Sequence, residues 1–213
     1  GAVLAWAVAQ AVPSAPLGFV AALVICPVLV GALAYAIDAG LLRRLKHDAE
    51  ATIVATIGLS YILQQGALSL FGPDARPVEA PFTLRLQLPW FGFSGYKLFV
   101  VVAAALVLLA VWWVMTRSRA GLVMRATQID RATARAFGIN VDRVYAGTFA
   151  LGAGLAAVAA VLIVPIQQAH YLMGHDPLLL SFIVVIIGGL GSIRGTLIAA
   201  LVADTLFGWI AGL

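Results

Sequence analysis

RSRAGLVMRATQIDRATARAFGINVDR, residues 117–143, is the polar stretch that sets the fold of an otherwise apolar chain. It contains 6 of the 13 cationic side chains, and long apolar runs flank it on both sides. Arginine-rich short loops resist translocation and stay on the cytoplasmic side of a membrane. The stretch therefore predicts a cytoplasmic loop of an integral membrane protein.

Short amphipathic helices are expected inside this loop. Apolar residues recur in steps of three and four over residues 122–136, which makes one helix face. Asp130 is placed to cap a second helix, and Gly138 is placed to end it in the left-handed conformation. Asn140 or Asp142 would then begin the next membrane helix. A solvated loop lying on the lipid headgroups is the alternative interpretation.

Composition also indicates a membrane protein. Of 213 residues, 63% are hydrophobic and 10% are charged, and the mean hydropathy is +1.05. Soluble domains have about a quarter of their residues charged. The net charge of +4 lies mostly beside apolar segments, which fits membrane topology and anionic lipid and argues against a nucleic-acid partner. Cys26 is the single cysteine, so no disulfide framework follows.

The apolar runs predict an all-α, polytopic transmembrane helical bundle with six to seven membrane segments. The chain begins without methionine and looks truncated at both ends, and residues 1–213 are interpreted as one transmembrane domain. Residues 1–12 make half a span. The further segments are expected at 17–42, 49–70, 97–116, 144–164, 178–190 and 195–213. A long outer loop, rich in proline, is expected at residues 71–96.

The segment at 49–70 carries more polar groups than anchoring requires. Thr52, Thr56 and Ser60 are spaced by four and Gln64 continues the row, so all four fall on one helix face. This face either lines a solute pathway or makes hydrogen bonds between helices. An acid in the last segment is a second candidate, because buried charge is costly in a membrane. The candidate solute-path residues are Thr56, Ser60, Gln64, Gln65 and Asp204.

Glycine-rich segments predict close helix packing, because small residues let backbones approach one another. The candidate packing residues are Gly152, Gly154, Gly188, Gly189, Gly191 and Gly195. Arg194 favours a cytoplasmic break before the final segment. A re-entrant hairpin at 178–194 is the alternative, since broken backbone is tolerated at membrane depth where protein covers it.

Catalytic and metal-binding motifs are not found in the sequence. There is no GxxxxGK[ST] phosphate loop, so no ATPase site is expected in this chain. His170, His175 and Asp176 lack the spacing of a metal site and are interpreted as polar groups of an outer loop. Asp38 and Asp204 come from distant segments and do not form the paired groups of an intramembrane enzyme. We expect no catalytic residue, no metal and no cofactor.

Four stretches resemble the permease subunits of branched-chain amino acid ABC transporters, in that family's order. They are ATIGLSYILQQ (55–65), RSRAGLVMRATQIDRATARAFGINVDRV (117–144), LGAGLAAVAAVL (151–162) and IGGLGSIRGTLIAAL (187–201). Within the family they look closer to the H-type permease of high-affinity leucine, isoleucine and valine importers than to the longer M-type partner. Related permeases for urea and short-chain amides share these motifs. A channel or secondary transporter, which would not need the amphipathic loop, is a further alternative.

The resemblance implies an ABC importer permease fold in a bacterial inner membrane. It implies a second homologous permease subunit, two cytoplasmic subunits that bind ATP and magnesium, and an external substrate-binding protein as partners. It also implies that residues 117–143 couple the membrane helices to the ATPases. The implied coupling residues are Arg117, Arg119, Gly121, Arg125, Asp130, Arg131, Arg135, Gly138 and Asn140. Family members often have proline after the central acid; Arg131 stands there, which leaves the start of the second short helix open.

Overall fold

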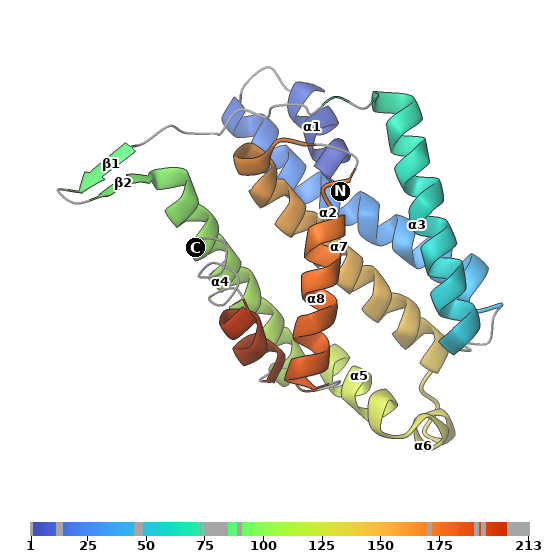
Figure 1. Ribbon diagram of the computed structural model, residues 1–213. Coiled ribbons are helices and arrows are strands. Elements are labelled where there is room, and N and C mark those ends of the chain that lie inside the picture. Colours follow the sequence, from blue (N-terminus) through green and yellow to red (C-terminus); the bar gives the residue numbers. More distant parts are fainter. Residues whose placement is uncertain are drawn as a thin grey trace. The chain divides into compact units, whose positions relative to one another are not determined.

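The computed structural model describes residues 2–11, 15–44, 49–72, 74, 85–88, 91–169, 172–189, 192 and 195–203. Asp204 and Gly191, like Arg194 and His170, lie outside the described residues. The chain divides into two compact units, Gly1–His170 and Tyr171–Leu213, which are considered separately. Both are built mainly from helices (Figure 1).

Among the described residues, four helical stretches are long and apolar enough to cross a membrane: Pro16–Leu42, Ala51–Phe71, Gly95–Arg117 and Val141–Gln167. They correspond to α2 (Ala15–Ile37) with its π-helical continuation η1 (Asp38–Leu42), α3 (Ala49–Phe71), α4 (Gly95–Arg117) and α7 (Val141–Gln167). At about 1.5 Å per residue, each exceeds the ~30 Å of a bilayer core. The all-α polytopic membrane fold is thereby confirmed.

α2 and α7 form the centre of the first unit and run antiparallel with touching backbones (Figure 1). A Cβ placed on Gly31 would lie 3.2 Å from the carbonyl oxygen of Ala150. One placed on Gly154 would lie 3.3 Å from the carbonyl oxygen of Pro27. Only glycine fits such contacts without displacing the neighbouring backbone, so these two positions set the distance between the helices.

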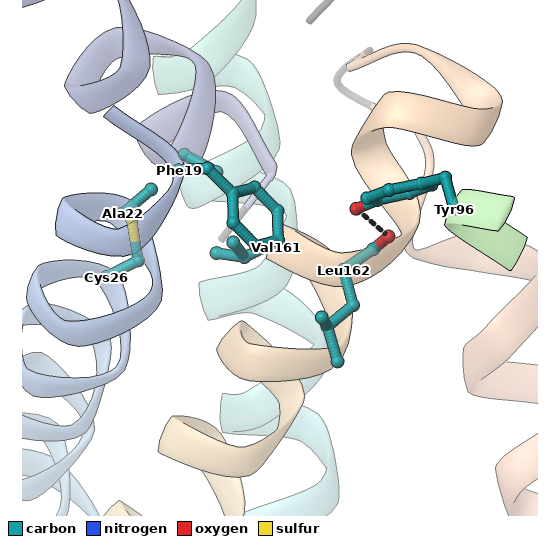
Figure 2. Packing of buried hydrophobic residues seen from close by; sticks show 7 residues of the cluster. Phe19, Ala22, Cys26, Tyr96, Val161 and Leu162 are labelled. Atoms are coloured by element: carbon teal, nitrogen blue, oxygen red, sulfur yellow. Dashed lines mark hydrogen bonds between the residues drawn. The ribbon is translucent and has the colours of Figure 1, made fainter. Parts of the chain in front are cut away.

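Aromatic packing joins the start of α4 to this pair. Tyr96 is buried and donates a hydrogen bond from Oη to the carbonyl oxygen of Leu162 at 2.9 Å (Figure 2). Its ring meets Phe19 of α2 edge to face, with ring centroids 6.2 Å apart. Cys26 and Val161 are buried in the same cluster, so Cys26 lies within apolar packing. The short α1 (Ala2–Ala11) packs on α2 beside it, where Gly18 approaches Ala9.

The described side chains of α3 and those of most of α4 are not buried. None of residues 51–71 and none of residues 97–117 is buried, although both stretches are strongly apolar. An apolar surface of this kind is stable against lipid or against other membrane helices. Within the described residues, the packed core of the first unit is therefore made by α1, α2, α7 and the beginning of α4.

A small antiparallel hairpin lies within the segment expected to be a loop. β1 (Arg85–Leu88) pairs with β2 (Phe91–Ser94) in the register Arg85↔Ser94 and Leu88↔Phe91. α4 follows β2 directly and begins two residues earlier than the expected segment at 97–116.

The second unit contains a broken helix. α8 (His175–Gly188) is 14 residues long, about 21 Å, which is less than a bilayer core. Gly189 ends it with a φ of +85°, and residues 195–203 are again helical. The hydroxyl of Ser192 accepts a hydrogen bond from the amide of Gly195 at 3.1 Å and caps this second segment. A span with a cytoplasmic break and a re-entrant hairpin at 178–194 both stay predictions.

Candidate functional site

Two short helices, α5 (Arg119–Ile129) and α6 (Arg131–Ala136), make up the polar stretch between α4 and α7. The junction from α4 to α5 is a single extended residue, Ser118, with φ −91° and ψ 155°. Its hydroxyl accepts a hydrogen bond from the amide of Gly121 at 3.1 Å and donates one to the carbonyl oxygen of Val114 at 2.6 Å. One side chain thus caps α5 and ties it to the last turn of α4.

Gly121 allows the close approach of α5 to α4 at this junction. A Cβ on Gly121 would lie 2.6 Å from the Cα of Met115, within the backbone of α4. That overlap cannot be relieved by a side-chain rotation, because the neighbouring atoms belong to the main chain. Gly121 is buried and therefore fixes the close contact between α4 and the start of α5.

Asp130 caps α6, as the sequence predicted. Its Oδ1 accepts hydrogen bonds from the amides of Ala132 at 2.8 Å and Thr133 at 3.2 Å, and its Oδ2 accepts one from the Thr133 hydroxyl. The Thr133 hydroxyl, followed by the two amides, lowers the pKa of this carboxyl below its ordinary value, because all three donors stabilise the anion. α6 begins at Arg131, which settles the start of the second short helix without a proline.

Gly138 ends α6 in the left-handed region with a φ of +80°, and Asn140 begins α7. The Asn140 side chain accepts a hydrogen bond from the amide of Arg143 at 3.1 Å. The positions expected for the helix stop and the next helix start are both confirmed. Only the residues Phe137 to Asn140 separate α6 from α7, so the connection is short.

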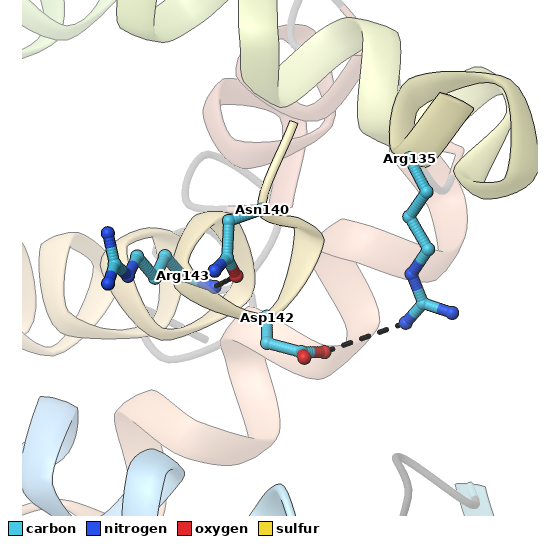
Figure 3. A network of polar contacts seen from close by, with 4 residues as sticks. All are labelled: Arg135, Asn140, Asp142 and Arg143. Atoms are coloured by element: carbon cyan, nitrogen blue, oxygen red, sulfur yellow. Dashed lines mark hydrogen bonds and ion pairs between the residues drawn. The ribbon is translucent and has the colours of Figure 1, made fainter. Parts of the chain in front are cut away.

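Side chains reinforce this connection from both helices. Arg135 forms an ion pair with Asp142 at 3.6 Å, with both side chains partly exposed (Figure 3). The guanidinium of Arg131 lies 4.8 Å from the ring centroid of Tyr145 in α7. Exposed contacts of these kinds each contribute about 1 kcal/mol or less. They act together with the caps to hold α6 against the first two turns of α7.

The two faces of α5 and α6 have different environments. The small residues Gly121, Thr127 and Ala134 are buried and face the rest of the first unit. The large apolar residues Leu122, Ile129 and Phe137 are 63%, 86% and 81% exposed. The exposed arginines of the stretch are Arg117, Arg119, Arg125, Arg131, Arg135 and Arg143. The element therefore presents a mixed apolar and cationic surface while it is joined tightly to α4 and α7.

A family model described as the permease component of branched-chain amino acid transport systems matches residues 1–212. The chain belongs to this family. A high-affinity branched-chain amino acid transport system permease protein of Pseudomonas aeruginosa, BraD, is 28% identical over 88% of this chain and 64% of its own length. LivH of Escherichia coli K12, which carries the same description, is 30% identical over 87% of this chain and 61% of its own length. A probable branched-chain amino acid transport permease of Methanocaldococcus jannaschii is 26% identical over 80% and 55%.

The chain spans less than two thirds of the length of those relatives. No solved structure matches it. Family membership and the four long apolar helices together identify an integral membrane protein. The resemblance found in the sequence is confirmed at the level of the family.

The predicted solute-path residues of the permease lie along α3, apart from Asp204. Thr56 and Gln64 are half-buried, whereas Ser60 and Gln65 are exposed. The hydroxyls of Thr56 and Ser60 donate to the carbonyl oxygens of Ile53 at 3.0 Å and Ile57 at 2.7 Å in their own helix. These local bonds make the hydroxyls compatible with an apolar environment. A role in a solute pathway stays a prediction.

The predicted packing glycines of the permease differ in what surrounds them. Gly154 lies against α2, whereas Gly152, two residues away on α7, has nothing within 4 Å of a built Cβ. In the second unit, Gly188 and Gly195 approach one another across the helix break, and a Cβ on Gly188 would lie 2.5 Å from the Cα of Thr196. Gly189 has open space around it and serves the turn through its positive φ.

Ser118 and Tyr145 make contacts that hold α5 and α6 to their neighbouring helices, and neither residue was among those predicted for this stretch. Ser118 stands one residue before α5, a position in which serine is a frequent cap, so its role was readable from the sequence. The contact of Tyr145 with Arg131 depends on the angle between α6 and α7, which the sequence pattern does not contain.

Proposed function

We propose that this chain is a membrane-spanning permease subunit of an ABC importer for branched-chain or related amino acids, driven by separate ATP-binding subunits. The observation that carries the proposal is the α5–α6 element: an exposed cationic and apolar surface joined stiffly to two membrane helices. The family match and the printed names of BraD and LivH support branched-chain amino acids as the solutes.

The α5–α6 element transmits movement because both of its ends are held. Ser118 and Gly121 fix α5 to α4, and Asp130, Gly138 and Asn140 define the path from α5 through α6 into α7. A force applied to the exposed face therefore acts on both membrane helices. Arginine suits carboxylate groups on a partner, since its guanidinium makes two parallel hydrogen bonds.

The proposed assembly contains a second homologous permease subunit, two ATPase subunits that bind ATP and Mg²⁺, and an external substrate-binding protein. It lies in a bacterial inner membrane, with α5 and α6 on the cytoplasmic side according to the arginine bias. In this assembly the solute passes between the two permease subunits. The proposed contacts on the path are Thr56, Ser60, Gln64 and Gln65 of α3, together with Asp204.

ATP-driven uptake by the assembled complex in proteoliposomes tests the coupling role. Arg125→Glu is expected to reduce uptake at least tenfold, because it reverses the charge on the exposed face, and Arg44→Glu is the matched control outside the element.

Gly138→Pro is expected to uncouple hydrolysis from uptake or to prevent ATPase docking. Gly72→Pro is its control, since Gly72 has the same φ of +80° at the end of α3. If Arg125→Glu and Gly138→Pro both support uptake at the native rate, the coupling role of the α5–α6 element is contradicted.

The alternatives differ in measurable ways. Solute or ion flux through the purified chain without any ATPase would select a channel or secondary transporter, to which the polar row on α3 would be suited. Inhibition of leucine uptake by urea or acetamide, measured with the complete complex, would indicate a permease for urea or short-chain amides. Exchange of Ser60 or Gln64 for alanine is expected to alter the rate or preference of uptake, and no change in either would exclude them from the path.

A further inference from the structure

The inner end of α2 contains an irregular turn with a buried acid. Asp38–Leu42 form a π-helical turn in which the amide of Arg43 donates to the carbonyl oxygen of Asp38 at 2.9 Å. Asp38 is 3% exposed and Leu42 is 5% exposed. π-Turns interrupt α-helices frequently at functional positions, and an acid within a membrane segment is a functional candidate because its burial is costly.

The register of α2 against α7 locates this turn. Pro27 lies against Gly154 and Gly31 lies against Ala150, so four residues forward along α2 correspond to four residues back along α7. Continued to the end of α2, this register brings Asp38 to the level of Arg143, within the first turn of α7. η1 contacts α7 in the structure, in agreement with this extension.

The first turn of α7 is also the end of the α5–α6 element. It is capped by Asn140 and is tied to α6 by the ion pair between Arg135 and Asp142. The N-terminal amides of a helix carry positive partial charge, and an acid beside them is stabilising. A buried carboxylate at this level can hold the start of α7 against α2, because it attracts the positively polarised amides of the first turn. A small movement of α7 would weaken this attraction.

We propose that Asp38 is a positioning residue that holds the first turn of α7 against α2 and so passes movements of α5 and α6 on to the α2–α7 pair. This inference rests on the proposed function. It does not require Asp38 to touch the solute or the ATPase subunits. Within the π-helical turn and the residues that follow it, Asp38 is buried whereas Arg43 and Arg44 are exposed.

The first test compares transport and hydrolysis in the reconstituted complex. Asp38→Asn preserves the side-chain volume but removes the charge, and we expect solute transported per ATP hydrolysed to fall at least fivefold at unchanged complex yield. Leu42→Ala is the matched control in the same turn, expected to lower the thermal midpoint and leave that ratio within twofold. A native ratio for Asp38→Asn, or an equal fall for Leu42→Ala, would overturn the proposal.

The second test is independent of ATP. Spin labels at Arg44→Cys and Gln128→Cys, both exposed positions, report the distance between the end of α2 and α5 in the chain in lipid nanodiscs, with Cys26→Ser as background. Asp38→Asn is expected to broaden this distance distribution, and Leu42→Ala to leave it narrow. An unchanged distribution in Asp38→Asn would overturn the positioning role. Absence of ATP-driven uptake by the unaltered complex would instead refute the proposed function.

Discussion

The closest backbone contact of the α5–α6 element is made by Gly121, which has a hydrogen atom where every other residue has a Cβ. A methyl group at this residue would overlap the main chain of Met115, so we expect Gly121→Ala to displace α5 and to cost roughly 1–3 kcal/mol, as overpacking does. Gly152→Ala is the control, because a Cβ there meets nothing within 4 Å and alanine favours helix by up to about 1 kcal/mol. Thermal unfolding in detergent should show a lower midpoint for the first variant only.

The stability of α6 depends on pH through its cap, Asp130. Because its folded-state pKa lies below the ordinary value of 3.8, the cap stabilises α6 above that pH and is lost as the pH falls through the lowered pKa. Titration of the Asp130 carboxyl carbon by NMR should give a midpoint below 3.8. Thr133→Ala should raise that midpoint by removing the main donor, and an identical midpoint in both proteins would contradict this account.

Residue roles that depend on local geometry could be predicted from the sequence, and those that depend on helix rotation could not. Asp130, Gly138 and Asn140 act on amides or φ angles within three residues of themselves, so their spacing was sufficient. Gly152 and Gly154 look equivalent in the sequence, yet only Gly154 faces α2. Leu122 and Ile129 belong to the predicted apolar face of α5, but the structure leaves that face exposed and buries Gly121 and Thr127.

Among the elements, α2 and α7 depend most on small residues. Gly31→Leu or Gly154→Leu is expected to push the helices apart, because the added side chain meets a carbonyl oxygen of the other backbone. Gly147→Leu in α7 is the control, since nothing lies within 4 Å of its built Cβ. The yield of folded protein after detergent extraction should fall for the first two variants and remain near the parent for the third.

The long helices were predictable because twenty or more apolar residues in sequence have few other stable arrangements. The observed ends of these helices differ from the expected ends by only a few residues. In α7, for example, the cap Asn140 decides the start, and not the first apolar residue. The π-turn at Asp38 and the hairpin formed by β1 and β2 were not predicted. Both arise from backbone pairing that leaves no periodic signal in five or fewer side chains.

For the whole molecule, the four long helices determine which loops share a side of the membrane. If α2, α3, α4 and α7 each cross once, residue 44 and the α5–α6 element lie on one side and residue 74 lies on the other. In cells expressing the full assembly, maleimide that does not cross membranes should label Asp74→Cys, and should label Arg44→Cys or Gln128→Cys only after the membrane is opened. Labelling of Gln128→Cys in intact cells would place the coupling region outside and exclude the proposed function.

The π-turn also has a consequence for how this chain tolerates changes in length. A π-turn contains one residue more than the α-helical turn it replaces, so removal of Gly40 would leave enough residues to continue a regular helix from Ile37 to Arg43. The four remaining residues, at about 100° each, would turn the helix about as far as the five residues of the π-turn do, so everything before the deletion would keep nearly the same orientation relative to everything after it. Asp38 would then stand in a regular α-helical turn, and no apolar residue of the span would have been lost. Deletion of Gly40 should thus leave insertion into the bilayer intact and test the π-turn by itself.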